Sequence, residues 1–352
     1  MINYGRNIVL MLVVVVMVAV LIGASQVGTT PAKPMPKPAP AATASSLSWA
    51  EVLEQNPDPT VVTDADFLKR ITETKLPWRV KDKATGIEML LVPPGKFVMG
   101  MSPGDTEAVE LEKGVLENAS ELKYTEQPAH EVTITKAFYL GRTEVTQEQW
   151  MKVMRENPSD FSQSASRKSL TEKYITDGLT KQEAQAKAAA ETSGEASQAK
   201  HPVEQVSWDG CQKFCEKTGM KLPTEAQWEY ACRAGVRKPR YGELDQIAWY
   251  DKNSKGETHP VAQKASNALG FYDMIGNVFE WTNDWYEGDY YKSCEEGVVD
   301  PRGPVQSKLE ARVLRGGGWG DSASGCRASF RFYYAPSGQD GVVGCRVART
   351  AD

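Results

Sequence analysis

Two stretches say most about how this chain folds: GFYDMIGNVFEW at residues 270–281 and RGGGW at residues 315–319. The first fits neither helical nor strand periodicity, because turn formers, an amide and a carboxylate lie between large aromatic residues. This composition indicates a structured loop that wraps around an ion or a partner. Three consecutive glycines before Trp319 indicate a backbone held close to another group, since only glycine lacks the Cβ atom that would prevent the approach.

Regular elements surround these stretches. A Pro-Pro-Gly turn divides residues 88–100 into two short strands, and alternation predicts a further strand over residues 132–140. Thr146 and Thr224 each begin a Thr-x-x-Gln capping box, which predicts a helix after each, and residues 207–217 are expected to form another helix. Few helices and many short strands joined by long loops indicate an α+β domain.

Six motifs occur in a fixed order along the chain. They are PPGKFVMG (93–100), EVTQEQW (144–150), PVEQVSW (202–208), LPTEAQWEY (222–230), the stretch from Asn267 to Trp281, and RGGGW (315–319). Together they resemble the formylglycine-generating enzyme, or sulfatase-modifying factor, family over roughly residues 82–349. The resemblance implies a single loop-rich α+β domain related to the C-type lectin-like fold. It also implies copper-dependent and O2-dependent oxidation of a cysteine in a nascent sulfatase to formylglycine.

The resemblance does not extend to both active-site cysteines. Active members of the family carry Cys-His-x-x-x-Cys after the glycine motif, and counting from Arg315 places the second cysteine at Cys326. The first cysteine falls on Asp321, its histidine on Ser322 and the motif serine on Gly318. A carboxylate is a hard ligand that suits Cu(I) poorly, so the sequence argues against a conventional copper site. Cys326 remains the candidate catalytic residue, as a ligand, a redox residue or a structural cysteine.

Calcium is the metal that the resemblance favours. Asn277, Val278 and Glu280 match the family's calcium loop, and amide, carbonyl and carboxylate oxygens are ligands that Ca²⁺ prefers. The alternative is that Asn277 and Glu280 only hydrogen-bond the loop to itself. The family's other calcium site is not recognisable, because the segment around residues 248–250 is shortened and lacks its Asn and Asp.

Aromatic residues offer a second candidate site. Trp285, Tyr286, Tyr290 and Trp319 match the aromatic-rich cleft of the family and could line a ligand-binding groove. They could equally form the core of a domain with few regular elements. We expect Trp281 and Trp319 to be buried, and the other three to be the better candidates for surface recognition.

The N-terminus predicts export. Residues 1–28 contain an apolar run from Ile8 to Ala24 and are interpreted as a signal peptide or membrane anchor. Residues 29–46 form a Pro/Ala-rich linker, 47–81 a helical lead-in, and 82–352 the domain itself, with a polar insertion at 158–200 that holds one helix over about 180–191. The protein is therefore expected to be anchored in the membrane facing the periplasm or exterior, or secreted if the segment is cleaved.

Composition limits the partners. The formal net charge is −5 and no basic stripe is visible, which argues against nucleic acid. The six cysteines make disulfides plausible in an exported chain, with the pairing left open. Two functions remain: an oxidoreductase acting on an exported polypeptide such as a sulfatase, or a non-catalytic, calcium-stabilised module that binds an unknown ligand.

Overall fold

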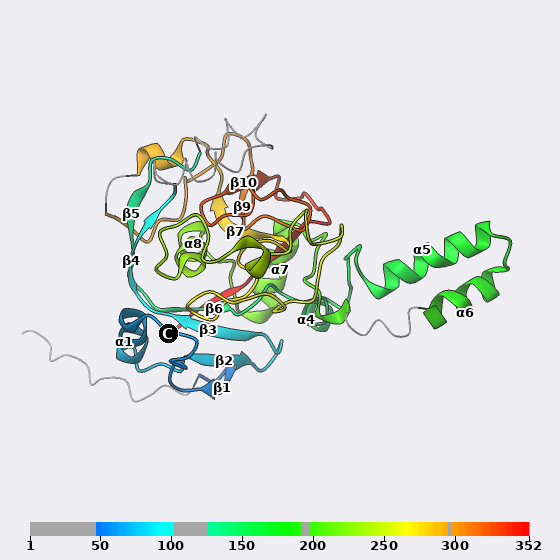
Figure 1. The fold of residues 1–352 in the computed structure, drawn as a ribbon, viewed down its shortest axis with the longest axis horizontal. Helices are drawn as coiled ribbons and strands as arrows, with labels where there is room; N and C mark the ends of the chain where they lie inside the picture. Colours follow the sequence, from blue (N-terminus) through cyan, green and yellow to red (C-terminus); the bar gives the residue numbers. More distant parts are fainter. Residues whose placement is uncertain (1–46, 102–124, 192–197, 295–296, 352) are drawn as a thin grey trace, which may run out of the picture. The chain divides into compact units, whose positions relative to one another are not determined.

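Strands in three sheets organise the domain (Figure 1). The computed structural model describes residues 47–101, 125–191, 198–294 and 297–351. The predicted signal or anchor, residues 1–28, and the predicted linker, 29–46, lie outside the described residues. Within the described ranges no helix is long and apolar enough to cross a membrane. The mixture of short strands, helices and long loops confirms the predicted α+β class.

The first sheet has the order β1-β2-β3-β6-β12 and is antiparallel throughout. Its strands are β1 (Ala50–Glu54), β2 (Arg79–Asp82), β3 (Glu88–Val92), β6 (Phe138–Gly141) and β12 (Ala348–Thr350). Leu90 and Tyr139 from its centre are fully buried. The sheet therefore joins the beginning of the domain to its last strand.

The expected helical lead-in over residues 47–81 is only partly helical. Asp64 caps α1 (Ala65–Glu73) as its sequence predicts, accepting hydrogen bonds from the backbone N–H groups of Asp66 and Phe67. On either side of α1, however, the chain forms β1 and β2, which pair with each other. Pairing with neighbouring strands outweighs the local helical preference. Such pairing cannot be read from the sequence of one segment alone.

The second sheet carries the stretch quoted first. Its order is β10-β9-β7-β11, with β7 (Phe279–Trp285), β9 (Arg312–Arg315), β10 (Arg331–Tyr334) and β11 (Val343–Cys345). Residues 270–278 form the expected loop, but a strand begins at Phe279, inside the stretch that shows no strand periodicity. Alternation is lost because consecutive residues from Phe279 to Thr282 are all buried.

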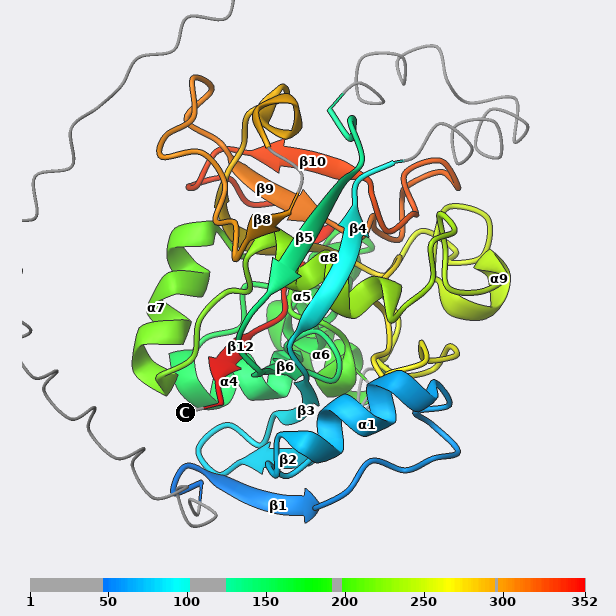
Figure 2. The same ribbon diagram turned by 90° about the vertical axis from the view of Figure 1, so that its left-hand side faces the viewer.

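The third sheet is small and has the order β4-β5-β8. Its strands are β4 (Gly95–Met99), β5 (His130–Ile134) and β8 (Val298–Val299), and β4 and β5 run side by side in Figure 2. The strand predicted over residues 132–140 is therefore two strands, β5 and β6, in different sheets. β5 ends just before Thr135, whose N–H and hydroxyl donate hydrogen bonds to the Asp300 carboxylate.

The predicted helices are present. They are α4 (Gln147–Met154), α7 (Trp208–Thr218) and α8 (Glu225–Arg233), and a one-turn helix α9 (Leu244–Ile247) follows. Both capping boxes form, at Thr146 and Thr224. In its described residues the insertion contains two α-helices rather than one, α5 (Gln163–Thr176) and α6 (Lys181–Glu191), and a short 3-10 helix, η1 (Gln198–Lys200). Tyr174 of α5 packs against Ala184 and Ala188 of α6. Helix α5 was missed because its apolar residues lack helical periodicity.

Candidate functional site

The glycine-rich turn after β9 packs directly against Cys326. Gly316 and Gly317 have φ values of +101° and +76°, a region that favours glycine. A Cβ atom at Gly317 would lie 3.0 Å from the Cys326 Sγ and 3.0 Å from the Gly325 carbonyl oxygen. Gly317 therefore lets the backbone approach the loop that carries Cys326, whereas a Cβ atom at Gly316 would face the Met274 carbonyl oxygen and the Trp228 ring, each at 3.2 Å.

Cys326 itself is inaccessible. Its exposed fraction is 0%, and it is a free thiol, as are the other five cysteines. Burial raises the pKa of the Cys326 thiol, and the neighbouring Asp321 carboxylate raises it further. Because the thiolate is both the nucleophile and the metal ligand, this environment opposes both roles at neutral pH.

Asp321 takes a structural position in the same loop. Its carboxylate accepts a 2.8 Å hydrogen bond from the Gly318 N–H, and its own N–H donates to the Gly318 carbonyl at 3.0 Å. Burial raises the pKa of Asp321 to about 6, and the charges of Asp251 and Asp340 act in the same direction. The residue that stands where the resemblance places the first cysteine closes the glycine turn.

Copper does not fit this arrangement. The described residues contain no group of three or more His, Cys, Asp or Glu side chains that could hold a metal ion. One buried thiol beside a carboxylate lacks the pair of soft ligands that Cu(I) prefers. No chemical step through copper is therefore derived for this chain.

The predicted calcium loop bonds to the protein itself. The Glu280 carboxylate accepts from Arg346 Nη2 at 2.8 Å and from Trp228 Nε1 at 2.7 Å. The Asn277 Oδ1 accepts from the His259 N–H at 3.0 Å. With these oxygens engaged, the geometry fits the self-bonded loop better than a cation site. Calcium at Asn277, Val278 and Glu280 remains a prediction.

The family model of the sulfatase-modifying factor enzyme 1-like domain matches residues 74–351. This chain belongs to that family. The formylglycine-generating enzyme of Streptomyces coelicolor is 36% identical over 172 residues, which are 43% of this chain and 54% of the enzyme. The serine/threonine-protein kinase pkn1 of Chlamydia caviae is 30% identical over 272 residues, 77% of this chain and 39% of the kinase. The chain thus spans about two fifths of the kinase and about half of the enzyme.

Solved structures share the fold of this sulfatase-modifying factor domain. Treponema denticola variable protein 1 is 26% identical with a TM-score of 0.55, over 75% of this chain and 95% of that protein. PvdO from Pseudomonas aeruginosa has the same TM-score at 24% identity, over 77% and 97% of the two chains. The family and fold inferred from the six motifs are confirmed.

The aromatic residues expected to line a groove have separate surroundings in this domain. Tyr286 is only 3% exposed and stacks on Tyr333, so the expectation that it serves surface recognition is wrong. Trp285 is half-buried beneath the Arg312 guanidinium, 3.4 Å from the ring centroid. Tyr290 is half-buried as well. These environments suit packing at the end of β7 and in η2 (Tyr290–Ser293), the 3-10 helix that follows it.

Trp319 is half-buried, whereas we expected a buried ring. Its indole N–H donates to the Gly341 carbonyl at 2.8 Å, and its ring meets Phe161 edge to face. Trp281 is fully buried, as expected. Of the four aromatic candidates, Trp319 is the one that lies in the same loop as Asp321 and Cys326.

Buried ion pairs involve three of the six family motifs, and their sequences alone did not predict these pairs. Arg315 of the glycine motif pairs with Glu229 of α8, and Arg331 pairs with Glu225 one turn earlier on the same helix. Arg346 pairs with Glu280. All three arginines are 0% exposed. The i,i+4 spacing of Glu225 and Glu229 is the signal that could have indicated a helix with two acidic groups on one face.

Glu144, from the motif before α4, is a further buried acid. Neither of its carboxylate oxygens has a hydrogen-bond partner in the described part of the chain. Burial raises its pKa well above the ordinary value, and the charge of Asp273 adds to this effect. A neutral Glu144 avoids the cost of an unpaired buried charge. Its place beside Arg346 and Glu280 makes it part of the scaffold.

Proposed function

We propose that this sulfatase-modifying factor domain is a non-catalytic binding module rather than a formylglycine generator. The observation that carries the proposal is the pairing of a fully buried Cys326 thiol with Asp321, which is hydrogen-bonded to the Gly318 N–H. Oxidation of a substrate cysteine by copper requires accessible soft ligands, and this loop offers one buried sulfur. Three of the motifs that identify the family instead contribute to buried ion pairs in the scaffold.

A second candidate function keeps the family chemistry. The 36% identity with the formylglycine-generating enzyme of Streptomyces coelicolor favours it. In that case the partner is an exported polypeptide such as a sulfatase, and Cys326 acts in its oxidation. Under the first proposal the partner is a different ligand, which the domain binds outside the membrane.

We also propose that residues 1–28 direct export and residues 29–46 act as a tether. The apolar run from Ile8 to Ala24 and the proline-rich composition that follows support this placement. Fusion of alkaline phosphatase after residue 46 gives active phosphatase if the segment is exported. An inactive fusion, made in normal amounts, argues against export.

One experiment separates the two functions. The full chain, purified in mild detergent and loaded with Cu(I), is incubated aerobically with a Cys-x-Pro-x-Arg peptide, and the peptide mass is followed. The Streptomyces coelicolor formylglycine-generating enzyme serves as positive control, and copper affinity is measured by competition with a chelator.

The binding-module proposal expects neither peptide conversion nor tight copper binding. Restoring the missing ligand with Asp321→Cys should then raise copper affinity only if Cys326 becomes accessible. Conversion by the unmodified chain that is lost in Cys326→Ser would overturn the proposal and establish the second function.

A further inference from the structure

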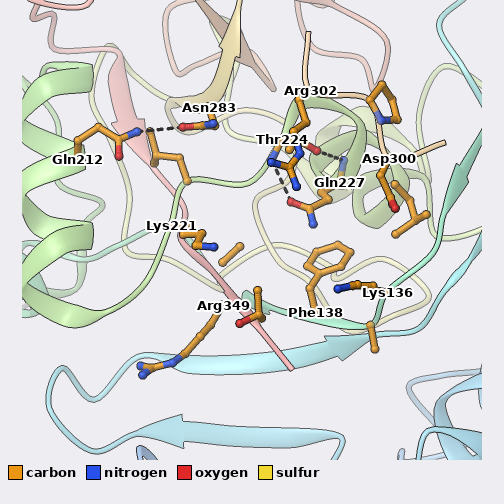
Figure 3. Close-up of a pocket in the computed structure, with 16 residues that line it drawn as sticks. Lys136, Phe138, Gln212, Lys221, Thr224, Gln227, Asn283, Asp300, Arg302 and Arg349 are labelled. Atoms are coloured by element: carbon orange, nitrogen blue, oxygen red, sulfur yellow. Dashed lines mark hydrogen bonds between the residues drawn. The ribbon is translucent and has the colours of Figure 1, made fainter. Parts of the chain in front are cut away.

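A cavity of about 580 Å³ is a second candidate site, and Figure 3 shows the residues that line it. Its walls come mainly from four places: β12, the chain from the end of β5 to the start of β6, the segment that joins α7 to α8, and the segment that follows β8. Single residues of α7, α8 and β7 complete the lining. Neither Cys326 nor Asp321 is among the lining residues. The volume falls within the range of pockets that hold small organic ligands, about 300–1,000 Å³.

The cavity is strongly cationic. Lys136, Lys221, Arg302 and Arg349 line it, together with one acid, Asp300. Four cationic groups and one acidic group give the lining a formal charge of +3, although the whole chain carries −5. Such a local reversal of sign draws anions toward the site.

Three of these cations have no side-chain partner among the residues that the structure describes. The side chains of Lys136, Lys221 and Arg302 make no hydrogen bond or ion pair with any residue that the structure describes. Arg349 differs, because it contacts Asp82 at 3.3 Å. The Asp300 carboxylate accepts hydrogen bonds from the N–H and hydroxyl of Thr135, so these oxygens are bonded to Thr135 rather than to the lysines or Arg302.

The cations come from separate segments but lie around one space. Lys136 precedes β6, Lys221 follows α7, and Arg302 follows β8, and Figure 3 shows all three side chains around the pocket. Bringing like charges together is unfavourable unless solvent or a counter-charge compensates them. A ligand with more than one acidic group can approach several of these cations at once.

The remaining lining favours an organic ligand over a bare ion. Phe138, Leu222 and Pro301 supply apolar surface. Gln212 donates to the Asn283 side-chain oxygen at 3.1 Å, which leaves the Asn283 amide hydrogens free to donate. The cavity thus combines apolar contact, amide donors and positive charge.

We propose that this cavity is a binding site for an organic anion that carries at least two carboxylate or phosphate groups. An acidic peptide segment and a phosphorylated small molecule share this chemistry. The site does not depend on the chemistry at Cys326, so it stands whether or not the domain proves catalytic.

The test is calorimetric titration of the full chain at low ionic strength, about 0.02 M, where screening is weak. The probes are tetraglutamate and inorganic triphosphate. Lys221→Gln and Arg302→Gln should each weaken binding about five- to tenfold, as expected for loss of one charge-assisted contact. Lys213→Gln is the matched control, because it removes the same charge from an exposed position of α7 outside the lining.

Asp300→Asn provides a variant of opposite sign. Removing the acid that lines the cavity should tighten binding about threefold, because an exposed carboxylate repels an anionic ligand only weakly through solvent. Since Lys221 and Arg302 have no described side-chain partner, their glutamine variants should melt within about 2 °C of the unmodified protein. A melting curve for each variant therefore separates lost binding from lost folding.

Each outcome decides the proposal. Binding of tetraglutamate alone assigns an acidic peptide, and binding of triphosphate alone assigns a phosphorylated ligand. Binding of both, weakened by the pocket variants and unaffected by Lys213→Gln, assigns a general polyanion site. The proposal fails if neither probe binds at about 1 mM, a free energy near −4 kcal/mol. It also fails if Lys213→Gln weakens binding as much as Lys221→Gln does.

Discussion

Gly317→Ala tests the packing of the glycine turn against Cys326. Alanine at φ +76° carries a conformational penalty of about 1–2 kcal/mol. Its Cβ would also lie 3.0 Å from both the Cys326 Sγ and the Gly325 carbonyl oxygen, which adds about 1–3 kcal/mol of overpacking. We therefore expect the free energy of unfolding to fall by about 2–5 kcal/mol, measured by urea denaturation with linear extrapolation.

Gly256→Ala is the control that isolates crowding from backbone strain. Gly256 has φ +81°, but a Cβ there meets nothing within 4 Å. Its expected cost is the conformational penalty alone, about 1–2 kcal/mol. Repeating Gly317→Ala in a Cys326→Ala background should recover part of the loss, because the sulfur is gone while the Gly325 contact remains. Equal destabilisation by Gly317→Ala and Gly256→Ala would refute the close packing around Cys326.

Three other expectations follow from burial and charge. Glu280→Ala leaves Arg346 buried without its partner and should lower the free energy of unfolding by about 3–5 kcal/mol in urea, and a loss below about 1 kcal/mol would contradict the pairing. Burial raises the pKa of Asp284 to about 8, so the stabilising contribution of the protonated carboxyl is complete below about pH 4 and is lost as the pH rises through 8. Relative to the unmodified chain, Asp284→Asn should therefore gain on the order of a few kcal/mol in free energy of unfolding between pH 5 and pH 9. Unfolding measured at both pH values tests this expectation. In thiol titration with an aromatic disulfide, half-buried Cys294 should react before unfolding and Cys326 only after it, whereas rapid reaction of Cys326 in the native protein would disprove its burial.

Local chemistry made much of the fold predictable. The capping boxes at Thr146 and Thr224 mark their helices, because a threonine and a glutamine three residues later satisfy first-turn N–H groups without help from the rest of the chain. The consecutive glycines predict a close backbone approach, and the structure shows the neighbours: Cys326 for Gly317, and Trp228 with the Met274 carbonyl for Gly316. Such signals are contained within a few residues.

Features that depend on distant residues were less accessible. β1 forms because β2 pairs with it, and β7 begins inside an apparent loop because both of its faces are buried. At the candidate site, counting residues located Asp321 and Cys326. Counting could not show that Glu280 would bond to Arg346, since ion pairing across the core is set by tertiary packing.

The pairing of β12 with β6 has a consequence for biosynthesis. β6 (Phe138–Gly141) has two neighbours in the sheet, β3 and β12. β12 (Ala348–Thr350) is synthesised roughly two hundred residues after β6. Contacts of such long sequence separation slow folding, because a large loop must close before they form. The emerging chain therefore cannot complete this sheet until β12 has been synthesised and has left the ribosome.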